Sequence, residues 1–137
     1  MDAEQLMTAN PVFVEEDTSL GEALELFVER NIRHLPVVRN GEIVGILSDR
    51  DLMRLGLSLV PTVEEIERTS ARMSIDVSQL MSADVISVDR ATTLREMVDI
   101  ILNEKIGALP VVDSETNELV GIVSYVDILQ ALKDQGE

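Results

Sequence analysis

An internal duplication is the feature of this sequence that most limits how the chain can fold. Similar segments recur at an offset of 74 residues, which becomes 76 after a two-residue insertion in the second copy. The aligned segments are 7–10 with 81–84, 18–20 with 92–94, 35–38 with 109–112, and 42–48 with 118–124. A repeat of roughly 50 residues is marginal alone, so we expect the two copies to complete one another.

Each copy predicts the same succession of elements: a strand, a helix, two strands and a helix. Ser/Thr-x-x-Glu capping boxes at 19–22 and 93–96 precede apolar residues at helical spacing. The predicted strands are 12–14, 35–38 and 43–47 in the first copy and 85–88, 109–112 and 119–123 in the second, the last two of each copy forming a hairpin. Closing helices are expected at 49–57 and 125–133. The fold class is therefore α+β, with two β-α-β-β-α units whose small mixed sheets pack with helices.

The copies are expected to occupy residues 1–57 and 81–137, joined by a connector at 58–80 that has no counterpart in either copy. Gly and Ser are sparse in the connector, and Pro61 precedes a plausible helix start at Thr62. The connector thus predicts a short additional helix rather than a flexible linker, and its role is open.

Composition argues against several classes of function. The chain has 26 acidic and 11 basic residues and a net charge of −15, which disfavours nucleic acid as a partner because phosphates are neutralised by Lys and Arg. With no cysteine and one histidine, no disulfide and no thiolate or multi-histidine metal site is expected. The chain has no apolar run of roughly 18 residues and no basic leader, so we expect a cytoplasmic protein that does not enter a membrane.

A serine and an aspartate recur where the third strand meets the closing helix. Ser48 and Asp51 of the first copy correspond to Ser124 and Asp127 of the second. This pattern suits a nucleotide, because a helix N-terminus favours a phosphate and a carboxylate can accept hydrogen bonds from a ribose diol. The same Ser-x-x-Asp spacing is close to a capping box and would also serve helix stability alone. The motif by itself leaves both interpretations open.

Residues 7–57 and 81–132 resemble CBS domains, the cystathionine-β-synthase-type regulatory modules that occur in pairs. The resemblance rests on Ile32-Arg33-His34-Leu35-Pro36-Val37-Val38 with Gly45-Ile46-Leu47-Ser48-Asp49-Arg50-Asp51, and on the equivalent segments 106–112 and 121–127. It implies a pseudo-twofold pair of repeats with two clefts for adenosine-containing ligands such as AMP, ADP, ATP or S-adenosylmethionine, without a covalent cofactor. It also implies a homodimer.

The resemblance further implies a role for individual residues. Asp51 and Asp127 would take the ribose hydroxyls, and Ser48 and Ser124 would lie near ribose or phosphate. Apolar residues would surround the adenine, namely Met81, Ile86 and Ile106 at the Asp51 cleft, and Met7, Val12 and Ile32 at the Asp127 cleft. Ordinary core packing is the alternative for these apolar residues.

The two clefts are expected to differ in charge. Four basic positions of the first copy and their counterparts in the second are Arg33 and Gly107, His34 and Ala108, Arg50 and Val126, and Arg54 and Gln130. Because Arg offers a planar fork to a phosphate, the Asp51 cleft should bind the phosphorylated ligand. The Asp127 cleft would then bind weakly, bind a less charged adenosine derivative, or stay empty. The alternative is that Arg33 and Arg50 pair with surface carboxylates.

The predicted function is a stand-alone regulatory module that binds AMP, ADP or ATP between its repeats and signals by a change of packing. The alternative is a dimerising scaffold that contacts a partner protein through its acidic surface or connector, with no small ligand. No nucleophile, metal cluster or catalytic base is recognisable, so an enzyme is not expected. The regulated target should be a separate protein chain.

Overall fold

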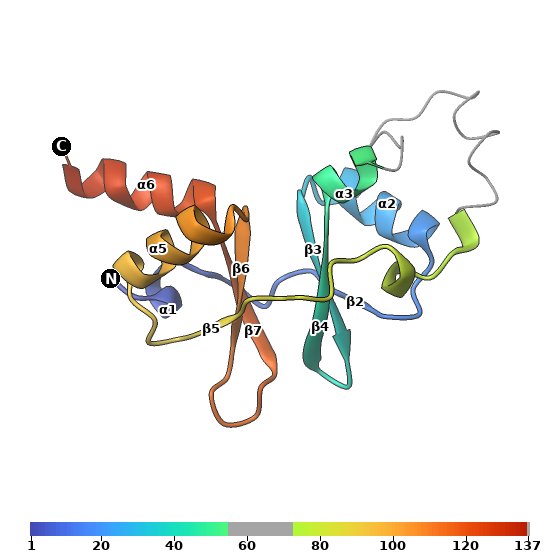
Figure 1. Cartoon of the computed structure of the whole chain (residues 1–137), viewed down its shortest axis with the longest axis horizontal. Helices are drawn as coiled ribbons and strands as arrows, with labels where there is room; N and C mark the ends of the chain where they lie inside the picture. Colours follow the sequence, from blue (N-terminus) through green and yellow to red (C-terminus); the bar gives the residue numbers. More distant parts are fainter. Residues whose placement is uncertain (55–72, 137) are drawn as a thin grey trace. The chain divides into compact units, whose positions relative to one another are not determined.

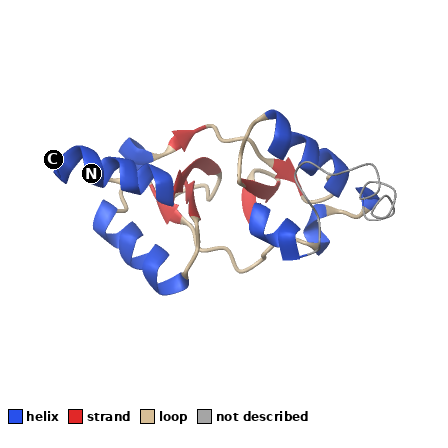
Figure 2. Ribbon diagram, turned by 90° about the horizontal axis from the view of Figure 1, so that it is seen from above, coloured by secondary structure: helices blue, strands red, loops and turns tan. Residues whose placement is uncertain are grey.

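The computed structural model describes residues 1–54 and 73–136, which form two compact units (Figure 1). We name each unit after its aspartate of the repeated Ser-x-x-Asp motif. The Asp51 unit contains Val12–Asn40 and Val44–Val85. The Asp127 unit contains Met1–Pro11, Gly41–Ile43 and Ile86–Glu137. In each unit the helices lie on one face of a small sheet (Figure 2). The predicted α+β fold class is confirmed.

The Asp51 unit has a three-stranded sheet in the order β2-β3-β4. Its elements are β2 (Val14–Glu15), α2 (Leu20–Glu29), β3 (His34–Arg39), β4 (Glu42–Ser48), α3 (Asp49–Arg54) and the 3₁₀ helix η2 (Val77–Gln79). The short strand β2 runs parallel to β3, with Val14 opposite Val37. Helix α2 buries Leu20, Ala23 and Phe27, which recur on one helix face, and so covers the sheet with an apolar stripe.

The Asp127 unit has a four-stranded sheet in the order β1-β7-β6-β5. Its elements are α1 (Ala3–Leu6), β1 (Thr8–Ala9), β5 (Val88–Asp89), α5 (Leu94–Glu104), β6 (Ala108–Val112), β7 (Leu119–Ser124) and α6 (Tyr125–Gly136). β6 and β7 form the predicted antiparallel hairpin, while β5 runs parallel to β6. Leu109, Val111 and Val123 are fully buried in the core between this sheet and its helices.

Each copy contributes its first segment to the unit built around the other copy. In the Asp127 unit the amide of Ala3 donates to the carbonyl oxygen of Thr92 over 2.8 Å. In the same unit Leu94 N donates to Met1 O (2.9 Å) and Glu4 N to Arg90 O (3.1 Å). The equivalent bonds of the Asp51 unit, 74 residues away, are Val77 N to Thr18 O, Leu20 N to Ile75 O (both 2.8 Å) and Ser78 N to Glu16 O (3.2 Å). The compact units therefore do not coincide with the sequence copies 1–57 and 81–137.

The same hydrogen bonds extend the repeat upstream, because residues 75–80 are the counterpart of residues 1–6. This corrects the assignment of 58–80 as a connector with no equivalent in either copy, since its last six residues have one. The helices α1 and η2 that carry these segments are too short to show a hydrophobic period. The connector helix predicted from Thr62, and residues 55–57 of the helix predicted at 49–57, lie outside the described residues.

Element ends differ from the prediction in a few places. β2 and β5 are shorter than the predicted strands 12–14 and 85–88 and begin later, because only Val14–Glu15 and Val88–Asp89 pair with a neighbouring strand. Thr93 forms the complete capping box, whereas Ser19 accepts from the amide of Glu22 without the reciprocal bond. Of the helices in the described part of the chain, none is long and apolar enough to cross a membrane.

Candidate functional site

Ser48 and Asp51 form a reciprocal cap at the junction of β4 and α3. The amide of Ser48 donates to Asp51 Oδ2 over 2.9 Å, and its hydroxyl donates to the same oxygen over 3.0 Å. In return, the amide of Asp51 donates to Ser48 Oγ over 3.1 Å. The aspartate thus occupies the place that Glu usually takes in a capping box.

Ser124 and Asp127 repeat this arrangement between β7 and α6. The amide and hydroxyl of Ser124 donate to Asp127 Oδ2 over 2.9 and 3.1 Å, and the amide of Asp127 donates to Ser124 Oγ over 3.3 Å. The capping role that the sequence allowed is therefore present in both copies. The serine donates only to Oδ2 of each carboxylate, so Oδ1 is the oxygen through which each aspartate can bind another group.

The two Oδ1 atoms have different surroundings. Arg54, one turn further along α3, forms an ion pair with Asp51 Oδ1. At the equivalent position of α6, Gln130 turns away and donates to Asp134 over 3.1 Å. No described residue donates to Asp127 Oδ1. Asp51 is accordingly 6% exposed, whereas Asp127 is half-buried.

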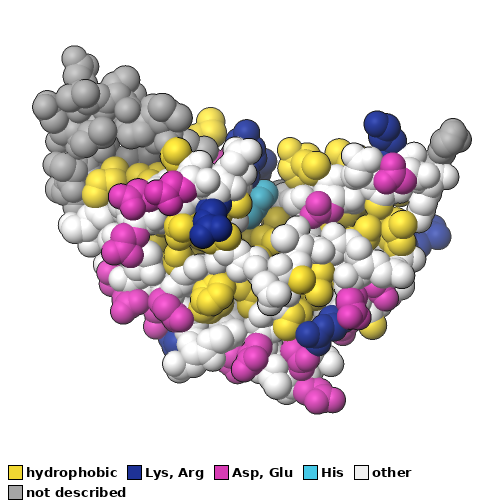
Figure 3. All heavy atoms as spheres, turned by 180° about the vertical axis from the view of Figure 1, so that it is seen from behind, with side chains coloured by type: hydrophobic (Ala, Val, Ile, Leu, Met, Phe, Trp, Pro, Cys, Tyr) yellow, Lys and Arg dark blue, Asp and Glu magenta, His cyan; other side chains and the backbone are white. Residues whose placement is uncertain are grey.

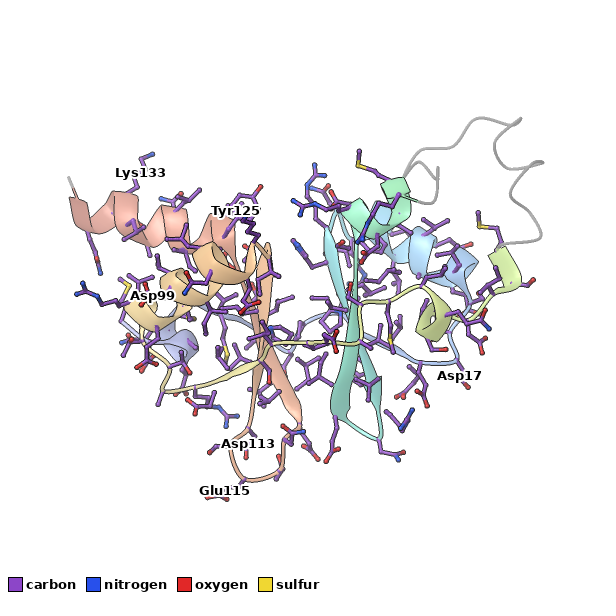
Figure 4. The ribbon with its side chains drawn as sticks, in the orientation of Figure 1. Asp17, Asp99, Asp113, Glu115, Tyr125 and Lys133 are labelled. Atoms are coloured by element: carbon purple, nitrogen blue, oxygen red, sulfur yellow. The ribbon has the colours of Figure 1, made fainter. Side chains whose placement is uncertain are left out.

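A backbone bond brings the residues before β3 to the start of α3. The amide of Asp49 donates to the carbonyl oxygen of Arg33 over 3.0 Å. The second copy has the same bond, from Tyr125 to Gly107 over 2.9 Å, and Tyr125 begins α6 (Figure 4). Because this bond joins the strand to the helix, Arg33 and His34 lie beside the Ser48–Asp51 pair, although they are far from it in the sequence.

The basic residues around Ser48 and Asp51 are in part already paired. Arg33 Nη1 lies 3.0 Å from Asp49 Oδ2, and the Arg33 side chain is 68% exposed. Such an exposed pair is weak and easily exchanged for another anion. In this structure Arg33 thus pairs with a carboxylate, which was the alternative to binding a phosphate. Its partner, Asp49, was not predicted from the sequence. Only the fold, which joins β3 to α3, reveals it.

His34 is half-buried, and the single histidine is visible at the surface of the molecule (Figure 3). Burial is the largest influence on its pKa and lowers it below the ordinary value. The charges that act on this pKa are, from largest to smallest, Asp49 (raising), Arg50 (lowering), Asp51 (raising) and Arg33 (lowering). These groups are therefore close enough to form one cluster.

A methionine lies against a strand glycine in each unit. A Cβ atom built on Gly45 of β4 would overlap the Met81 side chain, and one built on Gly121 of β7 would overlap Met7. The chain following each methionine pairs with the same strand: Ser82 exchanges hydrogen bonds of 3.1 and 2.9 Å with Ile46. Glycine is needed because the methionine occupies the space of a side chain.

The structure brings together some of the predicted site residues and not others. The Asp51 unit contains Arg33, His34, Ser48, Arg50, Asp51 and Met81, and the Asp127 unit contains Met7, Ser124 and Asp127. The four remaining residues are partly buried against the cores of their own units, Val12 and Ile32 in the Asp51 unit and Ile86 and Ile106 in the Asp127 unit. Their place beside a ligand of the opposite unit stays a prediction.

Two grooves lie away from these aspartates. One, of about 430 Å³, runs between β2 and α2 past Phe13 and Glu22, and its repeat equivalent, of about 380 Å³, lies between β5 and α5. Neither groove is lined by Ser48 and Asp51 or by Ser124 and Asp127. Within residues 1–54 and 73–136, no group of three or more His, Cys, Asp or Glu side chains is placed to hold a metal ion.

These paired units define a known class of protein. The CBS domain family model matches residues 3–58 and 77–134, and the chain belongs to this family. The two matches begin 74 residues apart, in agreement with the upstream extension of the repeat. The crystal structure of CBSX2 in complex with AMP has a TM-score of 0.80 and 29% identity, covering 99% of this chain and 98% of that one.

Longer relatives contain a similar segment. The chain is 34% identical over 125 residues to homoserine O-acetyltransferase of Methanocorpusculum labreanum. The aligned region covers 90% of this chain and 23% of that protein. The chain is 35% identical over 117 residues to the 5'-AMP-activated protein kinase subunit gamma-3 of Sus scrofa, covering 80% of this chain and 21% of that protein. The chain thus spans less than a quarter of the length of these two relatives.

Proposed function

We propose that the chain is a regulatory module that binds AMP, ADP or ATP and transmits ligand binding as a change in packing. The observation that carries this proposal is the Ser–Asp pair, repeated with the same hydrogen bonds at the same strand–helix junction of both units. The similarity to CBSX2, whose structure contains AMP, and to a subunit of an AMP-activated kinase supports an adenosine ligand.

In this proposal the aspartates hold the ribose, and each serine fixes the carboxylate through its amide and hydroxyl. Arg33, His34 and Arg50 receive the phosphate at the Asp51 site, where the exposed Arg33 can exchange Asp49 for the ligand. Aliphatic side chains surround the adenine: Met81, Ile86 and Ile106 at the Asp51 site and Met7, Val12 and Ile32 at the Asp127 site. The Asp127 site lacks these cations and takes a less charged ligand or none.

The ligand regulates by binding one packing arrangement more tightly than another, because only a difference in affinity can shift such an equilibrium. The module itself carries out no reaction. Its location in the cytoplasm stays a prediction.

Titration calorimetry with AMP, ADP and ATP tests the proposal, using the wild-type protein and the variants Asp51→Ala and Asp127→Ala. Asp51→Ala should abolish the phosphate-dependent binding, and an unchanged affinity in that variant would refute the site. Thermal unfolding should show a higher melting temperature with ligand, because a ligand that binds only the folded state stabilises it by mass action. A melting temperature unmoved by every adenosine compound at millimolar concentration would favour the scaffold alternative.

One observation bears on the homodimer, which both the ligand-binding module and the ligand-free scaffold would form. Repeat-equivalent apolar side chains stand exposed on the helices of both units, namely Val28 (53%) with Leu102 (68%), and Met53 (71%) with Leu129 (58%). Contiguous exposed apolar patches mark interfaces, and we propose that these side chains contribute to such a patch. Sedimentation equilibrium of Leu102→Lys and Leu129→Lys variants tests this: a dimer should dissociate into monomers, and a wild-type monomer would rule out the homodimer.

A further inference from the structure

The ion pair between Arg54 and Asp51 places a cation on the carboxylate oxygen that a ribose would need. Asp51 Oδ2 already accepts two hydrogen bonds from Ser48, so a diol must approach Oδ1, where the Arg54 guanidinium lies. The Asp127 carboxylate presents the same inner bonds, but no cation among the described residues pairs with its Oδ1, and Gln130 at the position of Arg54 is bonded to Asp134. A ligand thus meets an occupied carboxylate in one unit and an open one in the other.

The two partners of this ion pair differ in freedom. The Asp51 side chain is 7% exposed and held by Ser48, whereas the Arg54 side chain is 67% exposed. On ligand entry the aspartate therefore stays and the guanidinium moves. A buried carboxylate that loses its cation is penalised, and an anion within reach of the displaced guanidinium would offset part of that loss.

We propose that Arg54 makes the Asp51 site selective for phosphorylated nucleosides. A neutral nucleoside separates the ion pair and provides no anion for the guanidinium. A nucleotide provides a phosphate, to which the Arg54 guanidinium can donate two hydrogen bonds. Gln130 leaves the Asp127 site open to a neutral nucleoside. This inference rests on the proposed adenosine-binding function and adds a specificity-determining residue to it.

The test compares adenosine with AMP on ¹⁵N-labelled full-length protein, following the amide signals of Ser48 and Ser124 so that each site is measured separately. In the wild type, Ser48 should respond to AMP at much lower concentration than to adenosine. Arg54→Gln, which installs the residue of the second copy, should tighten adenosine binding at Ser48 by at least about tenfold, the scale of one charge-assisted hydrogen bond. Gln130→Arg should weaken adenosine binding at Ser124 by a similar factor.

Arg30→Gln is the control for net charge, because it removes a cation from the exposed end of α2 in the same unit. It should leave the ratio of the two dissociation constants at Ser48 unchanged. If Arg54→Gln weakens AMP and leaves adenosine binding unchanged, Arg54 is an ordinary phosphate contact and the inference is wrong. Equal changes for both ligands would also overturn it. Absence of any response to AMP or adenosine in the wild type would instead refute the adenosine-binding function itself.

Discussion

Arg39 donates two hydrogen bonds of 2.7 Å to the two carboxylate oxygens of Glu16, which joins the end of β3 to the residue after β2. At the equivalent positions of the second copy, the charges are exchanged: Arg90 follows β5, and its Nη1 lies 2.6 Å from Oδ2 of Asp113, which follows β6. Each pair spans 23 residues of sequence. The repeat therefore preserves the interaction and not the residue types.

Exchanging the charges of the first pair should be tolerated, because the second copy already uses the reverse polarity. Glu16→Arg alone places two cations together and should lower the urea midpoint of unfolding. The double variant Glu16→Arg with Arg39→Glu should return the midpoint close to that of the wild type. A double variant no more stable than the single one would show that the site requires this polarity.

Stability should fall in acid in part through Asp113, which lies in the turn between β6 and β7 (Figure 4). The pKa of Asp113 is lowered to about 2, mainly by the hydrogen bond from Arg90 and further by those from the amides of Thr116 and Glu115. A carboxyl whose pKa is lower in the folded than in the unfolded state contributes stability above the unfolded value of about 4. That stability is lost as the pH falls from about 4 towards 2.

Melting temperatures measured between pH 5 and pH 2 check this expectation. Asp113→Asn should flatten the acid decline, and Arg90→Gln should move it to higher pH because the pKa of Asp113 then rises. An acid decline that is the same in all three proteins would contradict the role of Asp113.

His34 should titrate below the ordinary histidine pKa of about 6.5, because burial disfavours its charged form. The stability from neutral His34 is complete above about pH 6.5 and is lost as the pH falls through the folded-state pKa. Arg50→Gln should raise the pKa by removing a nearby positive charge.

Proton NMR can follow this directly, because the chain has one histidine. Arg30→Gln serves again as the control and should leave the midpoint unchanged. A midpoint at or above 6.5 in the wild type would contradict the burial of the ring. Added AMP should raise the midpoint if the phosphate is received beside His34.

Gly45→Ala should destabilise the protein by about 1–3 kcal/mol, because the new methyl group overlaps Met81. The double variant with Met81→Ala removes the obstacle, so the alanine should cost less there than in the wild-type background. Urea unfolding of the two single variants and the double variant gives the coupling energy. Additive effects would mean that the methionine moves aside freely. Gly121→Ala and Met7→Ala form the matching cycle in the Asp127 unit.

Local patterns in the sequence were sufficient for the strand, helix, hairpin and closing helix of each copy and for the Ser–Asp pairs, but not for the short elements α1, β1 and η2. Ser48 and Asp51 are three residues apart, so one strand ending and one helix start determine their contact. The pairs Glu16–Arg39 and Arg33–Asp49 join residues that only the folded sheet brings together, and any of the many carboxylates could have been the partner. The choice of Arg54 to bind Asp51, and of Gln130 to bind Asp134, likewise depends on side-chain direction rather than on spacing.

The exchange of first segments could have been anticipated in part. Asp2, Gln5 and Leu6 recur as Asp76, Gln79 and Leu80 immediately before the repeated methionine. This similarity is short. It indicates that the two segments are equivalent, but not which copy's sheet each segment joins. Backbone hydrogen bonds decide that question, because Ala3 bonds to Thr92 rather than to Thr18.

This exchange means that position along the chain is a poor guide to which binding site a change will affect. A tag or a deletion at Met1 disturbs the support of Met7 and hence the surroundings of Asp127, more than one hundred residues downstream. One copy expressed alone would carry a first segment with no sheet to join and a sheet whose edge lacks its cover. Two such halves would be expected to associate, each providing what the other lacks, so that the duplicated chain is a joined version of a dimer of single copies.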